Sequence, residues 1–339
     1  MNAGPAAVET AGLTKDYGLG RGIFDLDLRV EPGEVFGFLG PNGAGKTTTI
    51  RMLLDLIRPT RGRVEVLGRD PRRDGLEVRR RVGYLPGEFG FDERLTALEE
   101  LAYLDALRGG GSMGRAHELA ERLRLDLTKH ISELSRGNKQ KVALVQAFMH
   151  RPELLVLDEP SSGIDPLIQQ EVRDLVREAR DEGRTVFLSS HVLHEVQHLA
   201  DRVGIVRGGR LVTVERVHAI TALALRRVEA HFAHPVPAVA FDNVPGVRDV
   251  VTDATSLRCR MSGSFDPLLK ALAPFEVTSL TVEEADLEEV FLTYYRNDAY
   301  RSDGDRNAAG NRSDDHDATG DGAPAAPPVV EARSAETAA

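Results

Sequence analysis

The sequence predicts an α/β fold with a mainly parallel central sheet, and three observations support this prediction. Mainly apolar runs at 34–39, 154–157 and 185–188 have the length and composition of buried parallel strands. Each run leads through a glycine-rich or polar turn into a segment with helical periodicity, which is the order that a parallel sheet with crossover helices requires. Residues 8–13 and 24–30 alternate loosely in polarity on either side of a Tyr-Gly-Leu-Gly turn, and this alternation predicts an antiparallel β layer ahead of the main sheet.

The stretch Gly40 to Thr48 follows the first apolar run and matches the pattern G-x-x-x-x-G-K-[ST] at every position. Its glycines let backbone N–H groups converge on an anion, Lys46 adds a positive charge for the β- and γ-phosphates, and the Thr47 hydroxyl can ligate Mg²⁺. The helix that follows points its N-terminus at the phosphates. The sequence therefore predicts a P-loop NTPase core, with nucleotide-binding residues Gly40, Pro41, Asn42, Gly43, Ala44, Gly45, Lys46, Thr47 and Thr48.

A mostly helical segment interrupts the alternation of strands and helices. Two short strands, at 63–66 and 82–86, precede it. Thr96 and Glu99 are spaced as a helix capping box, and a run of three glycines ends the helix that they begin. We therefore predict a helical subdomain inserted at about residues 91–131.

Carboxylates follow the apolar run at 154–157. Asp158 and Glu159 lie where this strand should end, and doubly wound α/β folds bind their ligands at that edge of the sheet. Asp158 can hold the Mg²⁺ shell, and Glu159 can orient or deprotonate an attacking water. His191 follows the run at 185–188 and should reach the same edge.

Two helix starts supply further candidate residues. Ser135, Arg136, Gly137 and Asn138 precede an amphipathic helix at 139–150, and a hydroxyl and a glycine at a helix N-terminus suit the binding of a phosphate. Asp165 precedes a proline in the pattern of a helix N-cap with proline at the first helical position.

The sequence changes character after about residue 222. Alternating apolar residues and helical stripes at 223–297 predict a small α+β appendage, with one helix carrying Leu287, Val290, Phe291 and Tyr294. Residues 298–339 are rich in Asp, Ala, Gly and Pro, and we expect them to form a disordered acidic tail because they contain few large apolar side chains. The nucleotide-binding domain is accordingly predicted at residues 1–222.

Composition excludes several classes of function. The 339 residues carry a formal net charge of −10, which argues against a general nucleic-acid binder. The single cysteine, Cys259, excludes an internal disulfide and a cysteine metal cluster. Nothing approaches the roughly 18 to 20 consecutive apolar residues that a membrane span needs, and the first residues lack the features of a signal peptide. These observations predict a cytoplasmic protein without a membrane span.

Taken together and in this order, these residues resemble the ATP-binding cassette (ABC) ATPases across roughly Val8 to Ala222. The resemblance implies a head-to-tail dimer, either a homodimer or a pseudo-dimer with a paralogue, that binds ATP and Mg²⁺ between its subunits. It assigns the Walker A motif to Gly40 to Thr48, with Lys46 as the catalytic lysine, and the Walker B aspartate and catalytic glutamate to Asp158 and Glu159. The switch histidine is then His191, the D-loop aspartate Asp165 and the adenine-stacking aromatic Tyr17. The signature that acts in trans is Ser135, Arg136, Gly137 and Asn138.

Two positions depart from the usual family pattern. Gly87 and Glu88 stand where the family usually has a glutamine, and the signature reads Ser-Arg-Gly-Asn in place of Ser-Gly-Gly-Gln. Both variants, and the appended domain up to about Arg296, look like those of cassettes that serve multidrug and antibiotic exporters. The resemblance thus implies the ATP-hydrolysing subunit of an exporter, held on the cytoplasmic face of the membrane by a separately encoded permease.

Several alternatives stay open from the residues alone, and a nucleotide switch that does not hydrolyse ATP is the most remote of them. A soluble cassette ATPase acting on ribosomes or nucleic acid is the main alternative function, although the chain has one ATPase core and no heptad run. His191, His194 and His198 recur at helical spacing and could ligate Zn²⁺, but a switch role for the first and a solvated face for the others explain them better. Phe89 and Phe91 either pack into the helical subdomain or form a contact surface for a helix of the permease.

Overall fold

The computed structural model describes residues 4–219 and 225–283, and each of these two stretches is described by itself. The chain divides into two compact units, residues 1–292 and 293–339, of which the second lies outside the described residues. The helix predicted around Leu287 to Tyr294 and the tail predicted at 298–339 also lie outside them.

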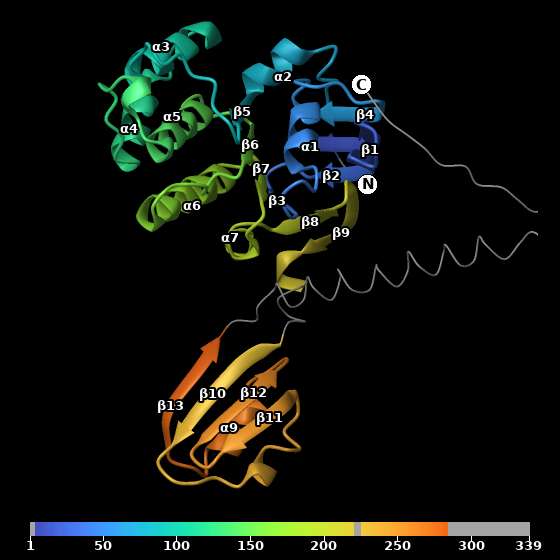
Figure 1. The fold of residues 1–339 in the computed structure, drawn as a ribbon, viewed down its shortest axis with the longest axis vertical. Coiled ribbons are helices and arrows are strands. Elements are labelled where there is room, and N and C mark those ends of the chain that lie inside the picture. The colour runs from blue at the N-terminus through green and yellow to red at the C-terminus, as the bar shows by residue number, and fades with distance from the viewer. Residues whose placement is uncertain (1–3, 220–224, 284–339) are drawn as a thin grey trace, which may run out of the picture. The chain divides into compact units, whose positions relative to one another are not determined.

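The central sheet of residues 4–219 has six strands in the order β5-β6-β7-β3-β8-β9 (Figure 1). Its strands are β3 (Val35–Leu39), β5 (Val82–Leu85), β6 (Leu154–Asp158), β7 (Thr185–Ser190), β8 (Arg202–Arg207) and β9 (Arg210–Arg216). All neighbours pair in parallel except β8 and β9, which form an antiparallel hairpin. Every residue of β3, β6 and β7 is buried, as expected for the central strands of a parallel sheet that is covered on both faces. The predicted mainly parallel sheet is confirmed.

A second, antiparallel layer has the strand order β2-β1-β4. It consists of β1 (Val8–Asp16), β2 (Gly22–Val30) and β4 (Arg61–Val66). Helix α1 (Lys46–Leu53) contacts β2 and β4 of this layer and β6 of the central sheet. Its buried Ile50, Met52 and Leu53 belong to one apolar core with side chains from both sheets. This packing fixes α1, and with it the preceding loop, between the two layers.

Helices make up the rest of residues 4–219. They are α2 (Gly75–Arg81), α3 (Ala97–Arg108), α4 (Met113–Arg122), the 3₁₀ turn η1 (Ile131–Glu133), α5 (Arg136–Phe148), α6 (Pro166–Asp181) and α7 (Leu193–Gln197). The predicted capping box is present, since Thr96 accepts from the Glu99 backbone N–H and the Glu99 carboxylate accepts from Thr96 N. Helix α3 ends at Gly109, whose φ of 105° only glycine adopts readily. Helices α3, α4 and α5 pack together as the helical layer seen in Figure 1.

Residues 225–283 form a four-stranded antiparallel sheet in the order β11-β12-β10-β13. Its elements are β10 (Arg226–Phe232), η2 (Ala238–Ala240), β11 (Val247–Asp253), β12 (Ser256–Met261), α9 (Asp266–Leu272) and β13 (Val277–Glu283). Its core gathers side chains of β10, β12 and α9, including Cys259. The alternation of β10 and β12 predicted these two strands. Strand β13 was not predicted, and all of its residues are exposed.

None of the helices in the described stretches is long and apolar enough to span a bilayer.

Candidate active site

The loops that follow β3, β6 and β7 meet at one edge of the central sheet. Strand β7 pairs with both β3 and β6, so the carboxyl ends of the three strands lie side by side although they are far apart in the sequence. A cavity of about 440 Å³ opens at this edge. Its lining includes the phosphate-loop residues Asn42, Gly43, Gly45, Lys46, Thr47 and Thr48 together with Asp158, Glu159 and His191. The structure therefore brings the three predicted groups into one site.

Lys46 supplies the positive charge of the phosphate loop and is buried. Its side chain is 6% exposed, and its ammonium donates to the carbonyl oxygens of Gly40 at 2.8 Å and Pro41 at 3.4 Å. A side chain at Gly45 would place Cβ 2.2 Å from the Ile23 methyl group, and the φ of Gly45 is 108°. Glycine is required here by both space and backbone conformation, and it lets α1 start directly at Lys46.

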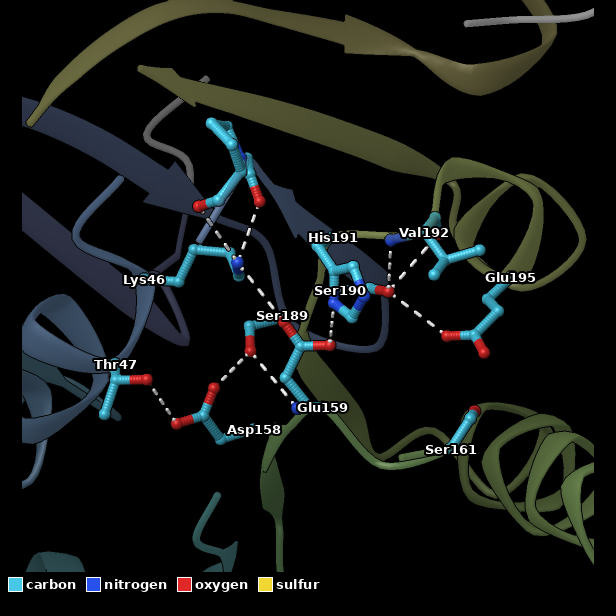
Figure 2. Close-up of polar contacts among 12 residues, drawn as sticks. Lys46, Thr47, Asp158, Glu159, Ser161, Ser189, Ser190, His191, Val192 and Glu195 are labelled. Atoms are coloured by element: carbon cyan, nitrogen blue, oxygen red, sulfur yellow. Dashed lines mark hydrogen bonds and ion pairs between the residues drawn. The ribbon is translucent and has the colours of Figure 1, made fainter. Parts of the chain in front are cut away.

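Asp158 sits at the base of the cavity and is 1% exposed. The hydroxyl of Thr47 donates to its Oδ2 at 2.8 Å, and the hydroxyl of Ser189 donates to its Oδ1 at 2.5 Å (Figure 2). A Cβ at Gly87 would lie 3.2 Å from Oδ2. The hydroxyl donors on Asp158 and the close approach of Gly87 hold the carboxylate in one orientation.

Glu159 lies between two basic groups. One carboxylate oxygen is 3.2 Å from the Lys46 ammonium, and the other is 2.7 Å from Nδ1 of His191 (Figure 2). Its backbone is left-handed, with φ 54°, and its N–H donates to the Ser189 carbonyl at 3.1 Å. A non-glycine residue in this conformation costs on the order of 1 kcal/mol, and such strain is concentrated at functional sites. The strained turn aims the carboxylate into the cavity.

Helix α5 carries the predicted signature residues and reaches the site through a glutamine. Ser135 caps the helix by accepting from the Asn138 N–H at 3.3 Å. Arg136 lines the cavity of its own chain, whereas the resemblance assigns the signature to the nucleotide of the other subunit. The Gln140 amide donates to the carbonyls of Pro160 at 3.1 Å and Glu159 at 3.4 Å. Sequence reasoning missed Gln140 because its partners are backbone atoms that no side-chain motif identifies.

Tyr17 and Asp165 lie outside the cavity lining. The other predicted residues outside it are Gly40, Pro41, Ala44, Ser135, Gly137 and Asn138. Tyr17 is 52% exposed, and the Lys15 ammonium lies 5.4 Å from its ring centre. Asp165 is the predicted N-cap of α6 and accepts from the backbone N–H groups of Leu167 and Ile168, each at 3.1 Å.

Gly87 and Glu88 stand at the position of the usual glutamine. Glu88 lines the cavity with Arg51, and their charged atoms are 3.9 Å apart. Burial, assisted by the charge of Asp158, raises the pKa of Tyr84 to about 12, while Arg51 opposes the shift by its charge and a hydrogen bond. Tyr84 is therefore a neutral hydrogen-bonding group at any physiological pH.

The three histidines considered as a zinc site do not come together. Helix α7 starts at Leu193, so His191 precedes it, whereas the rings of His194 and His198 lie 4.6 Å apart and meet edge to face. Across residues 4–219 and 225–283 no group of three His, Cys, Asp or Glu side chains could hold a metal ion. His191 instead contacts Glu159.

Comparison with known proteins adds the family. A family model described as ABC transporter matches residues 23–162. The chain is 40% identical to the bacitracin transport ATP-binding protein BcrA of Bacillus licheniformis over 208 residues, which cover 60% of this chain and 68% of BcrA. It is 35% identical to the daunorubicin/doxorubicin resistance ATP-binding protein DrrA of Streptomyces peucetius over 313 residues, which cover 86% of this chain and 93% of DrrA. The chain belongs to the ABC transporter ATP-binding family.

Solved structures agree with this assignment. The ATP-binding subunit of an ABC transporter superposes with a TM-score of 0.60 at 30% identity, covering 63% of this chain and 91% of that structure. A dimeric ATP-binding cassette in a post-hydrolysis state with ADP and Pi superposes with a TM-score of 0.57 at 24% identity, covering 62% of this chain and 98% of the other, and shows the fold alone. This ABC protein therefore has the cassette fold with a P-loop NTPase core, and it is an ATPase that binds and hydrolyses ATP.

Proposed function

We propose that this cassette powers a separately encoded membrane permease that exports a drug, an antibiotic or another small molecule. The similarity to DrrA carries the proposal, because it extends over 313 residues and so reaches well beyond the nucleotide-binding domain that we propose at residues 1–222. BcrA and DrrA are named for bacitracin transport and for daunorubicin/doxorubicin resistance. Both names favour transport over action on ribosomes or nucleic acid. The chain would act at the cytoplasmic face of the membrane, bound there to its permease.

In this proposal the residues around the cavity divide the work of hydrolysis. The backbone N–H groups of the loop at Gly40 to Thr48 and the Lys46 ammonium bind the β- and γ-phosphates. Glu159 accepts a proton from the attacking water, and its contacts with Lys46 and His191 support this role because they hold its carboxylate beside the phosphate loop. His191 orients the Glu159 carboxylate and donates to the γ-phosphate oxygens. Tyr17 stacks on the adenine from outside the phosphate cavity.

The oxygen atoms at the base of the cavity fit a magnesium ion. Thr47 offers a hydroxyl and Asp158 a carboxylate, which are hard oxygen ligands, and the two side chains are already 2.8 Å apart. A site of one hydroxyl and one carboxylate leaves most positions to water and phosphate oxygens, as Mg²⁺ requires. When bound, the ion would neutralise charge on the β- and γ-phosphates.

We further propose that ATP joins two copies of the cassette, or this cassette and a paralogue, head to tail. The signature Ser135, Arg136, Gly137 and Asn138 would then contact the nucleotide of the other subunit, with Asp165 at the interface. Ser135 and Asn138 support this proposal, because they stand at the N-terminus of a thirteen-residue helix whose first N–H groups suit a phosphate. For the chain as a whole we propose a nucleotide-binding domain at 1–222, an appendage at 223–297 and an acidic tail at 298–339.

Export is tested in cells that contain the chain and the membrane protein encoded beside it. The expected result is a lower intracellular level of a fluorescent anthracycline, or resistance to bacitracin, with the wild-type chain and not with Lys46→Ala. Purified Lys46→Ala should also bind ATP more weakly, because the loop loses its only phosphate-directed ammonium. Equal drug levels with both chains across a panel of antibiotics would overturn export, and unchanged ATP affinity would overturn the role of the loop.

A further inference from the structure

The turn that carries His191 is held by the hydroxyl of the residue before it. Ser190 ends β7, and α7 starts at Leu193. The Ser190 oxygen accepts from the Val192 N–H at 2.9 Å, and it lies 3.2 Å from the Val192 carbonyl and 3.1 Å from Oε2 of Glu195 (Figure 2). A hydroxyl has one proton to donate, so the carbonyl and the carboxylate compete for it. Whether the Val192 carbonyl receives this proton therefore depends on Glu195.

Glu195 is placed to act on the site without touching the cavity. It lies on α7, and its carboxylate reaches back over the turn to Ser190. Burial raises the pKa of Glu195, the hydrogen bond from Ser190 lowers it, the charge of Glu159 raises it, and the charges of His191 and Arg173 lower it. These are the charged groups that face it from the end of β6, from its own turn and from α6. Glu195 thus shares its surroundings with both members of the Glu159–His191 pair.

We propose that Glu195 is a positioning residue for ATP hydrolysis, which fixes the His191 ring against Glu159 by holding the Ser190 hydroxyl. The inference rests on the roles proposed above for Glu159 and His191. Ionised Glu195 accepts a charge-assisted hydrogen bond from the Ser190 hydroxyl. This bond is stronger than the alternative bond from the same hydroxyl to the Val192 carbonyl. His191 is the residue between the two ends of this clamp, Ser190 and Val192. Its Nδ1 is 2.7 Å from Glu159, and a misplacement of about 1 Å can cost on the order of a hundredfold in rate.

The test compares Glu195→Ala, Glu195→Gln and Ser190→Ala in the purified full-length chain. Glu195→Ala should lower kcat by about tenfold or more while the Kd for ATP stays within about twofold, because no phosphate contact is removed. Glu195→Gln should recover most of kcat, since its amide oxygen still accepts from Ser190. The double variant Glu195→Ala with Ser190→Ala should be no slower than the slower single variant, because both act through one hydrogen bond. His194→Ala, an exposed position on the same helix, is the matched control.

A second readout follows the His191 ring itself. Its imidazole NMR signals, assigned by their loss in His191→Ala, should move in Glu195→Ala and in Ser190→Ala but not in His194→Ala. Wild-type kcat in Glu195→Ala, unmoved His191 signals, or additive losses in the double variant would each overturn the proposal. If Glu195→Ala does not fold, Ser190→Ala decides by the same criteria. Full activity of His191→Ala would instead refute the proposed role of His191, and so separates the two failures.

Discussion

Replacing Glu159 by glutamine should nearly abolish turnover and at the same time tighten the binding of ATP. The amide retains the shape of the side chain and an oxygen that can accept from His191, so the turn at φ 54° is not disturbed. It cannot accept the proton of the attacking water. General-base catalysis contributes about 10² to 10⁴ in rate, so kcat should fall by that factor. This loss corresponds to an activation barrier that is higher by about 3 to 5 kcal/mol.

The gain in ATP affinity follows from the position of Lys46. Its ammonium lies 3.2 Å from the Glu159 carboxylate, and the two side chains are 6% and 21% exposed. A phosphate oxygen must therefore share this ammonium with a carboxylate. A hydrogen bond between charged groups contributes about 1.5 to 3 kcal/mol, and solvent reaches Glu159 in part, so relief of this competition should strengthen ATP binding by about 1 kcal/mol, or roughly fivefold.

Three measurements on purified chains check this prediction. Single-turnover release of phosphate gives the rate of hydrolysis, and equilibrium binding of ATP gives the affinity. Gel filtration in the presence of ATP should also show more dimer for Glu159→Gln than for wild type. The control is Glu121→Gln, which removes one negative charge from an exposed position on α4. Hydrolysis by Glu159→Gln near the wild-type rate would refute the assignment of the base, and weaker ATP binding would refute the competition for Lys46.

Three further predictions concern stability, the tail and coupling. Arg122 of α4 bonds Glu178 of α6 through both terminal nitrogens, at 2.8 and 2.5 Å, so Arg122→Gln should lower the free energy of unfolding in urea by about 2 kcal/mol after allowance for solvent screening. The hydrogen bond and charge of Arg122 lower the pKa of Glu178 in the folded chain. The loss of unfolding free energy in Arg122→Gln should therefore be complete above the unfolded pKa, near 4.5, and should shrink as pH falls through the lower folded pKa. A loss of stability that does not change with pH would contradict the ion pair. Deletion of everything after residue 297 should leave thermal stability and ATPase activity unchanged, and a large fall in melting temperature would show that the tail docks. Phe89 and Phe91 stack with ring centres 5.6 Å apart. Their joint replacement by alanine should leave the ATPase activity of the isolated chain unchanged but weaken co-purification with the permease. Unfolding of the variant would instead show that the pair belongs to the core.

The sequence predicted those parts of the site that a local pattern specifies. The phosphate loop needs glycine, lysine and threonine at fixed spacing, and an apolar strand ending in Asp158 leaves little choice about where a carboxylate lies. The N-cap at Asp165 and the capping box at Thr96 are likewise determined by neighbours within four residues. Such patterns survive without tertiary information, because the interactions that they describe are local in the chain.

The remaining parts of the site depend on distances that no local pattern encodes. Gln140 bonds carbonyls nineteen and twenty residues away, and Glu195 acts on a serine whose importance comes only from the His191 turn. The left-handed backbone of Glu159 could not be predicted, because its residue type disfavours that conformation and the surrounding fold imposes it. In the appendage, β13 lacked the buried alternate face that identifies a strand. Helical spacing was also misleading for His191, because α7 starts two residues later than the histidine pattern suggested.

With the roles proposed above for Lys46, Glu159 and His191, the order of strands in the central sheet leads us to expect that binding of ATP prepares the catalytic groups. Lys46, Glu159 and His191 follow β3, β6 and β7, and β7 lies between the other two strands. The loops after these three strands therefore meet around the Glu159 carboxylate. Glu159 has one oxygen on Lys46 and the other on His191. A γ-phosphate that takes up the ammonium leaves the first oxygen with a weaker partner while the second remains held by the histidine. The carboxylate then keeps its orientation but gains an oxygen free to accept a proton. In this way the contact between Lys46 and the phosphate would also free the Glu159 carboxylate to act as a base. Without nucleotide, the same carboxylate oxygen stays paired with Lys46 and is not free to accept a proton from water.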